Sequence, residues 1–442
     1  MPNPKIRFPA SRVPIAVSRS RRLIACDLTA LDGSKPAQWP RARELVYFLL
    51  NSLENSYRIV IHGAPGCLFP DAEDHVVFTP APSERLIRTA SCPDCKSRRH
   101  CPGLPSRLAG MVPHPEPIAD LPKEIVIEVG KECNLHCRAC FAGTGRAGPS
   151  FREIKRIADR AKSLGIKSLR FSGGEPLLRP DIFRLLEYAK ESGFYVILNT
   201  NATLCDAPTT RKLAPLVDNA LISLQGCDPG SDRSLTRGAV PFAVKLGNIA
   251  RVVDSGIAIV RIGTIMSGLL LRRFRRYADV VVGLGVKNWE LYRPMLDREA
   301  LAANPAFNIR REDAVRLCRS LDRLNRLGFN AKIANAFPFC LLDDEGMRNS
   351  VLMGAGADEG HSRLIFDGRG FFKPSYFINQ DLGTDIVKAW HHPFLKRLNS
   401  LRYLPAACRR CRELKWCLGG SRFWAFQASG GYFRRDPWMP SP

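Results

Sequence analysis

Six strand-like runs separated by helical segments constrain the fold of this chain more than any other feature. The runs are rich in apolar and β-branched residues, and they cover residues 124–129, 168–172, 194–198, 220–224, 257–265 and 288–292. Strands that alternate with helices form a parallel sheet with the helices outside it. We therefore expect an α/β fold whose sheet is either open or curled into a partial barrel.

Two of the intervening segments carry clear helix signals. Ser150 and Glu153 have the spacing of a capping box, and Gly165 ends the apolar stripe that follows them. A second helix is expected from about Asp181 to Gly193. Ligands of such folds bind at the carboxyl ends of the strands. Residues that directly follow a strand are therefore the first candidates for a site.

Three cysteines follow the first strand with the spacing C-x3-C-x2-C, namely Cys133, Cys137 and Cys140. Cysteine thiolates hold iron–sulfur clusters, and a cubane contains four irons. Three thiols therefore leave one iron open to bind a small molecule. A zinc site with a fourth ligand such as His136 is the alternative.

The second strand ends in Gly173, Gly174, Glu175 and Pro176. Two adjacent glycines let the backbone approach a ligand closely, and their amides can donate hydrogen bonds to it. Combined with C-x3-C-x2-C, this motif resembles the radical S-adenosylmethionine (radical SAM) superfamily over roughly residues 124–330.

The resemblance implies a partial (β/α)6 TIM-like barrel and a [4Fe-4S] cluster whose open iron binds the amino and carboxylate groups of S-adenosylmethionine. In this family one electron from the cluster cleaves the sulfonium and yields a 5′-deoxyadenosyl radical for hydrogen abstraction. The same resemblance implies that Gly173 and Gly174 meet the methionyl amine, within a cofactor-binding motif that includes Glu175 and Pro176.

Two later motifs agree with the family pattern. The segments at 198–203 ("LNTNAT") and 221–226 ("LISLQG") resemble its third- and fourth-strand motifs, which implies that Asn201 and Ser223 lie near the ribose or carboxylate. Ala139 stands where the family has an aromatic residue before its third cysteine. We expect Phe141 to take over the contact with adenine.

Both flanks of the barrel repeat one cysteine pattern, Pro-x-Cys-Leu followed by C-x2-C-x5-C. The C-terminal flank resembles SPASM and twitch extensions, although Ser375, Ser421 and Met439 replace three cysteines of the full seven-cysteine pattern. We expect one fully ligated auxiliary cluster in each flank, with zinc as the alternative. The expected ligands are Cys67, Cys92, Cys95 and Cys101 in the N-terminal flank and Cys340, Cys408, Cys411 and Cys417 in the C-terminal one.

Three domains follow from these motifs. They are an N-terminal auxiliary cluster-binding domain at 1–121, a radical SAM core at 122–331 and a SPASM/twitch-like auxiliary cluster domain at 332–442.

Among the remaining cysteines, Cys227 follows the fourth strand directly, where barrel loops face the substrate. A catalytic thiol there would give a hydrogen atom to a substrate radical, as some radical epimerases require. A small buried hydrophobe is the alternative. Glu290, Tyr292 and Arg293 are further candidates because they end the sixth strand.

The net charge of +24 implies an acidic partner. An acidic peptide or protein substrate suits it, whereas nucleic acid is less expected because aromatic residues are not interleaved with the basic runs. No apolar run approaches the roughly 18 residues that span a bilayer, so we expect a cytoplasmic protein without a membrane partner. A flavodoxin or ferredoxin is the expected reductant.

The sequence thus predicts a radical SAM oxidoreductase or maturase that modifies a peptide or protein. An RNA-modifying radical SAM enzyme and a non-catalytic iron–sulfur sensor or scaffold are the alternatives. A sensor has no use for Gly-Gly-Glu-Pro beside an open-site cluster.

Overall fold

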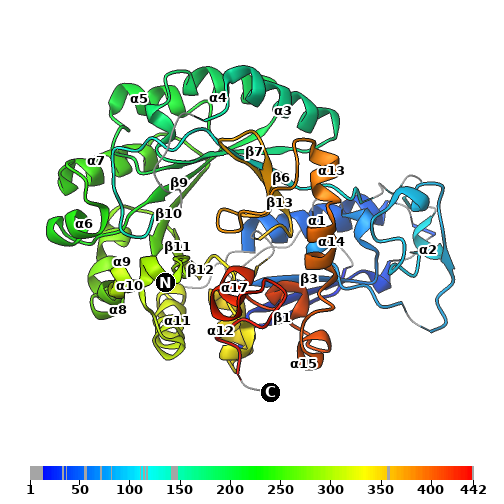
Figure 1. Ribbon diagram of the computed structural model, residues 1–442. Coiled ribbons are helices and arrows are strands. Elements are labelled where there is room, and N and C mark those ends of the chain that lie inside the picture. The colour runs from blue at the N-terminus through cyan, green and yellow to red at the C-terminus, as the bar shows by residue number, and fades with distance from the viewer. Residues whose placement is uncertain are drawn as a thin grey trace. The chain divides into compact units, whose positions relative to one another are not determined.

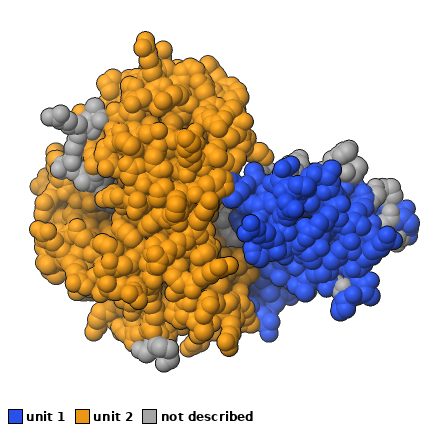
Figure 2. Space-filling model, turned by 45° about the vertical axis from the view of Figure 1, so that its right-hand side comes forward, with its two compact units in different colours: residues 1–120, 344–350 blue, residues 121–343, 351–442 orange. Residues whose placement is uncertain are grey.

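The computed structural model of the chain divides into two compact units (Figures 1 and 2). Unit 1 comprises residues 1–120 and 344–350, and unit 2 comprises residues 121–343 and 351–442. The structure describes residues 13–31, 34–35, 37–53, 57–69, 72–80, 82–109, 111–112, 115, 118–140, 148–355 and 359–440.

Unit 2 contains a nine-stranded sheet, as far as the described residues show, with the order β12-β11-β10-β9-β8-β7-β6-β13-β14. All neighbours are parallel except the hairpin of β13 and β14. The strands are β6 (Glu124–Glu128), β7 (Ser168–Ser172), β8 (Tyr195–Thr200), β9 (Asn219–Ser223), β10 (Ile259–Ile265), β11 (Asn288–Tyr292), β12 (Asn330–Ile333), β13 (Arg363–Phe366) and β14 (Phe372–Lys373).

Helices cover the outer face of this curved sheet, which confirms the partial barrel (Figure 1). They are α3 (Phe151–Ser163), α4 (Ile182–Glu191), α5 (Ala207–Leu213), α6 (Pro229–Thr236), α7 (Phe242–Val253), α8 (Gly268–Arg272), α9 (Phe274–Gly283), α10 (Arg298–Ala303) and α11 (Arg311–Asn325). The capping box of Ser150 and Glu153 forms at the start of α3, as its spacing predicts.

The C-terminal region adds two strands to the same sheet. The expected boundary at 331/332 falls inside β12, and β13 pairs in parallel with β6 through Leu364 and Ile125. Short helices follow, namely α13 (Ile386–Trp390), α14 (Pro393–Ser400), α15 (Ala406–Arg409), α16 (Leu414–Cys417) and α17 (Arg422–Ser429).

Unit 1 is more regular than its many prolines suggest. The strands β1 (Ile15–Ser18), β2 (Leu23–Asp27) and β3 (Arg58–His62) form one sheet, and α1 (Gln38–Leu53) connects β2 to the parallel β3. Pro40 lies in the first turn of α1, where proline is tolerated. Leu45, Val46 and Leu49 of this helix belong to a hydrophobic core within the unit.

Smaller elements complete unit 1. The strands β4 (Leu86–Ile87) and β5 (Leu104–Pro105) pair in antiparallel fashion, and α2 (Ser106–Ala109) follows them. Most of α12 (Glu345–Val351) also belongs to this unit. None of the helices in the described part of the chain is both long and apolar enough to cross a membrane.

Candidate active site

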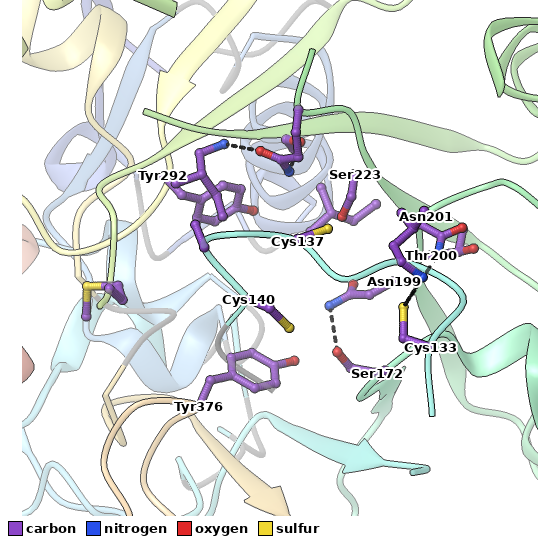
Figure 3. A pocket seen from close by; sticks show the side chains of 18 of the residues that line it. Cys133, Cys137, Cys140, Ser172, Asn199, Thr200, Asn201, Ser223, Tyr292 and Tyr376 are labelled. Atoms are coloured by element: carbon purple, nitrogen blue, oxygen red, sulfur yellow. Dashed lines mark hydrogen bonds between the residues drawn. The ribbon is translucent and has the colours of Figure 1, made fainter. Parts of the chain in front are cut away.

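A cavity of about 220 Å³ lies inside unit 2 at the carboxyl ends of the strands (Figure 3). Seven of the residues expected to bind the cluster or the cofactor line this one cavity, although they come from four different segments. They are Cys133, Cys137, Cys140, Gly173, Gly174, Asn201 and Ser223. The sheet therefore brings together side chains that are as many as 90 residues apart in the sequence.

The loop after β6 holds the three cysteines at the cavity. The amides of His136 and Arg138 donate to the carbonyls of Thr236 and Leu235, each at 2.9 Å, and so fix the loop to the end of α6. His136 is exposed and does not line the cavity, which does not favour it as a fourth metal ligand.

Two donors face the sulfur of Cys133. The Leu135 amide lies 3.4 Å from Cys133 Sγ, and Asn201 Nδ2 lies 3.8 Å from the same atom (Figure 3). Burial raises the pKa of Cys133, and it raises the pKa of Cys137 to about 12 with a smaller contribution from Cys140. Hydrogen-bond donors to the sulfur and a nearby positive charge both favour the thiolate form of cysteine. These thiols are therefore suited to binding a positively charged cluster.

Gly173 and Gly174 allow the end of β7 to touch the cysteine loop. A Cβ atom on Gly173 would lie 2.3 Å from the Gly130 carbonyl oxygen, and one on Gly174 would lie 2.0 Å from that of Glu132. The amides of Gly174 and Glu175 donate to these same two oxygens at 2.8 Å. The Gly174 amide is therefore engaged within the protein, and the expected donation from it to a ligand is not supported.

Glu175 does not line the cavity and instead holds the neighbouring strand. Its buried carboxylate accepts hydrogen bonds from Thr200 Oγ1 and the Asn201 amide, both at 2.7 Å, and from the Leu177 amide at 3.1 Å. Burial raises the pKa of Glu175, although these three donors oppose the shift. Pro176 begins a 3-10 turn and also lies outside the lining. Both residues thus position the site without forming its wall.

Asn201 links the third-strand motif to the cysteine loop. Its Nδ2 donates to Asn134 Oδ1 at 2.9 Å, while its Oδ1 accepts from the amide and hydroxyl of Thr203. The next residue, Ala202, adopts a left-handed φ of 59° at the position where the family motif has glycine. A non-glycine residue there is strained, so the loop is held by its hydrogen bonds.

The donor set and the glycine contacts fit an iron–sulfur cluster. The described residues contain no group of three or more His, Cys, Asp or Glu side chains arranged to hold a metal ion. A cubane distributes its cysteine ligands over different irons, so three thiols around a cavity suit it better than a single ion. Residues 127–281 match the model of the Radical SAM superfamily. The core of unit 2 is thus similar to the radical SAM superfamily.

One relative resembles the chain beyond this radical SAM core, and another resembles a shorter part of it. A PqqA peptide cyclase of Streptomyces rochei is 29% identical over 338 residues, which are 73% of this chain and 90% of the relative. An AdoMet-dependent heme synthase of Methanosarcina barkeri is 34% identical, but the match covers 25% of this chain and 33% of that relative.

Solved structures share the fold. The structure of Streptococcus suis SuiB bound to S-adenosylmethionine aligns with a TM-score of 0.58 at 20% identity, covering 73% of this chain and 78% of SuiB. Unit 2 therefore has the radical SAM fold. The chain is an enzyme of the radical SAM type, and its cofactors are a [4Fe-4S] cluster and S-adenosylmethionine.

Besides Glu175 and Pro176, a further predicted site residue lies outside the lining of the radical SAM cavity. Cys227 is buried and does not line it, and the amide of Cys227 donates to Ser231 Oγ at 3.0 Å. Its position after β9 is as predicted, but the loop turns the thiol toward Asp228 at 3.6 Å. Phe141 lies outside the described residues.

Sequence reasoning missed most cations of the cavity. Arg170, Lys245 and Arg363 line it together with Arg293, and no carboxylate does so among the described residues. The signals were an arginine inside the apolar run of β7 and a lysine on the apolar stripe of α7. Tyr376 from the C-terminal region also lines the cavity, which no local pattern indicated (Figure 3).

Each of three lining cations is paired with a carboxylate behind the wall. Arg170 binds both oxygens of Glu124 at 2.9 Å, Lys245 Nζ lies 3.3 Å from Asp232 Oδ1, and Arg293 is paired with Asp436. A ligand in the cavity therefore meets the positive ends of these pairs. At the end of β11, Tyr292 lines the cavity and its hydroxyl donates to Glu290, which lies behind it.

Within each of the two flanking cysteine sets, the thiols are close enough to influence one another electrostatically. Burial raises the pKa of Cys67 to about 12, and the neighbouring thiols of Cys101, Cys95 and Cys92 add to this shift. Likewise, burial raises the pKa of Cys340 to about 11, with Cys417, Cys408 and Cys411 as further causes. The backbone amides of Thr89 and Phe339 donate to Cys92 Sγ at 3.3 Å and Cys417 Sγ at 3.5 Å.

Proposed function

We propose that the chain is a radical SAM enzyme that modifies a peptide or protein substrate inside the cavity of unit 2. One observation carries this proposal: three cysteines from a single loop line the same cavity as Gly173, Asn201 and Ser223. A [4Fe-4S] cluster held by Cys133, Cys137 and Cys140 would supply the electron that cleaves S-adenosylmethionine and starts hydrogen abstraction.

The residues of the chain then have distinct tasks. Glu175 and the glycine pair fix the cysteine loop and the loop after β8 relative to each other, through the hydrogen bonds described above. Asn201 supports Cys133 and, with Ser223, offers polar groups at the cavity wall where the cofactor would lie. Buried apolar residues such as Leu235 exclude water from the radical chemistry.

A peptide substrate is supported by the relatives and by charge. The relative from Streptomyces rochei is named a peptide cyclase, and one solved SuiB structure contains its precursor peptide. The cations that line this cavity favour a substrate group with negative charge. An acidic peptide also suits the net charge of +24.

We further propose that the two flanking cysteine sets hold auxiliary [4Fe-4S] clusters. Each set has four thiols, which is the full complement for such a cluster. Anaerobic reconstitution should therefore give about twelve irons per chain, about four of which are lost when Cys340 and Cys408 become serine. Stoichiometric zinc with only four irons would instead assign the flanking sites to zinc.

The main proposal is tested by anaerobic incubation with dithionite and S-adenosylmethionine. The wild-type enzyme should form 5′-deoxyadenosine, and the variant with Cys133, Cys137 and Cys140 changed to alanine should form none. Acidic precursor-type peptides should raise the rate and gain a mass change. If the triple variant is as active as wild type, the proposed site is wrong.

A further inference from the structure

A second hollow of about 320 Å³ lies on one face of α11 in unit 2. It is lined by Arg311, Glu312, Val315, Arg316, Arg319 and Leu341. Arg311, Val315 and Arg319 follow each other at four-residue spacing, so they share one face of the helix. Three of the six lining residues are exposed arginines, which makes the hollow strongly cationic.

The nearby acidic residues neutralise this face only in part. Arg311 pairs with Glu312 at 2.7 Å, and Arg316 shares Asp313 with Arg310. Arg319 has no ion pair in the part of the chain that the structure describes. The face therefore retains a positive charge for a partner.

The cationic face continues to the C-terminal cysteine set. Leu341, which lines the hollow, directly follows Cys340, and Cys340 and Cys411 are exposed. Exposed basic residues also flank the other cysteines of this set, namely Arg409, Arg410, Arg412 and Lys415. Two of the four cysteines of this set are thus exposed residues with basic residues around them.

We infer that this face, defined by Arg311, Arg316, Arg319 and the exposed Cys340 and Cys411, docks an acidic one-electron carrier protein. The inference rests on the proposed function, because it assigns an auxiliary cluster to the C-terminal cysteines. Cys340, Cys408, Cys411 and Cys417 would hold a cluster able to accept one electron from the reduced carrier and to pass it on to the centre held by Cys133, Cys137 and Cys140, without any bond forming or breaking in the transfer. Complementary charge steers such encounters and accelerates association.

An electron carrier fits this face better than RNA does. Single-stranded nucleic acid is held by aromatic residues on which the bases stack, and no aromatic residue lines the hollow in the described residues. Exposed thiol ligands have no use in RNA binding, whereas they shorten the path of an electron to a docked partner.

The test separates docking from chemistry with two reductants. Arg311, Arg316 and Arg319 are changed together to glutamate, and the matched control changes Arg152, Arg156 and Arg160, which are exposed on α3 and span the same length of helix. 5′-Deoxyadenosine formation is measured with photoreduced flavodoxin and, separately, with dithionite, which needs no docking.

At low salt the α11 variant should lose at least about tenfold in flavodoxin-driven rate, and its dithionite-driven rate should stay at the wild-type value. The α3 control should change neither. An unchanged flavodoxin-driven rate in the α11 variant would overturn the inference. The inference would also be overturned if the α11 variant lost binding to a single-stranded RNA probe but kept its normal rate with flavodoxin.

A binding measurement keeps docking testable even if the proposed chemistry fails. Fluorescence anisotropy of labelled flavodoxin should show binding to the wild-type enzyme that weakens with salt, and at least tenfold weaker binding to the α11 variant. Wild-type enzyme that binds flavodoxin but forms no product with dithionite would contradict the proposed function alone. Equal binding of flavodoxin by the wild-type enzyme and the α11 variant would contradict the docking face alone.

Discussion

Arg293 and Asp436 form a fully buried ion pair that joins the end of β11 to the C-terminal segment. Arg293 Nη1 lies 2.8 Å from Asp436 Oδ2, and both side chains are 0% exposed. The guanidinium lies 3.6 Å from the ring centre of Trp438 and 5.0 Å from that of Trp424. The ion pair therefore ties Arg293, which lines the radical SAM cavity, to a residue 143 positions away.

Removal of one partner of this pair should destabilise unit 2. Asp436→Asn leaves the Arg293 charge buried without compensation, which costs about 3–5 kcal/mol. The Arg293→Met/Asp436→Leu double variant should lose less than the two single variants combined. Denaturant unfolding measures these differences, and Asp159→Asn in an exposed pair with Lys155 is the control, with a loss of at most about 1 kcal/mol. Additive losses would show that the pair is not coupled.

Gly174→Ala should detach the cysteine loop from β7. The added Cβ would lie 2.0 Å from the backbone oxygen of Glu132, which cannot move without shifting the loop. We expect the variant to fold but to bind about four fewer irons after reconstitution. Gly283→Ala is the control, since a Cβ there meets nothing within 4 Å. Full iron content in Gly174→Ala would contradict the close packing described here.

Glu175→Gln should weaken the site without removing any wall of the cavity. The amide nitrogen of glutamine would face donors that now bond to a carboxylate, at a cost of about 1–3 kcal/mol. We expect a higher KM for S-adenosylmethionine and a lower Tm, because the Asn201 loop loses its support. The exposed Glu187→Gln should match wild type in both measurements. An altered KM with an unchanged Tm would instead indicate direct contact between Glu175 and the cofactor.

Acid should destabilise unit 2 partly through His361. Burial lowers the pKa of His361 to about 4, although its hydrogen bond to Asn399 opposes the shift. The unfolded chain takes up this proton near its ordinary pKa of 6.5, so the contribution is full above that pH and is lost as the pH falls toward 4. His361→Gln should therefore reduce the drop in Tm between pH 7 and pH 5 by about 2 °C. The exposed His100→Gln should leave the drop unchanged.

The backbone elements of the barrel were predictable because they depend on local pattern. The apolar runs placed β7 and β11 to the residue, and the capping box placed the start of α3. The cavity wall was less predictable, because the direction of a side chain depends on neighbouring strands. Nothing near Cys227 in sequence shows that its thiol faces Asp228, and nothing near Glu175 shows that it holds Asn201. The contribution of Tyr376 depends on β13 pairing with β6, which is a contact between distant segments.

The pairing of β13 with β6 also has a consequence for biosynthesis. β6 begins at Glu124, but the strand that covers its free edge is completed only at Phe366. At translation rates of about 5–20 residues per second, that edge is unprotected for on the order of tens of seconds on the ribosome. An uncovered strand edge invites pairing with another chain, so the nascent protein needs a chaperone or slow local folding during this interval.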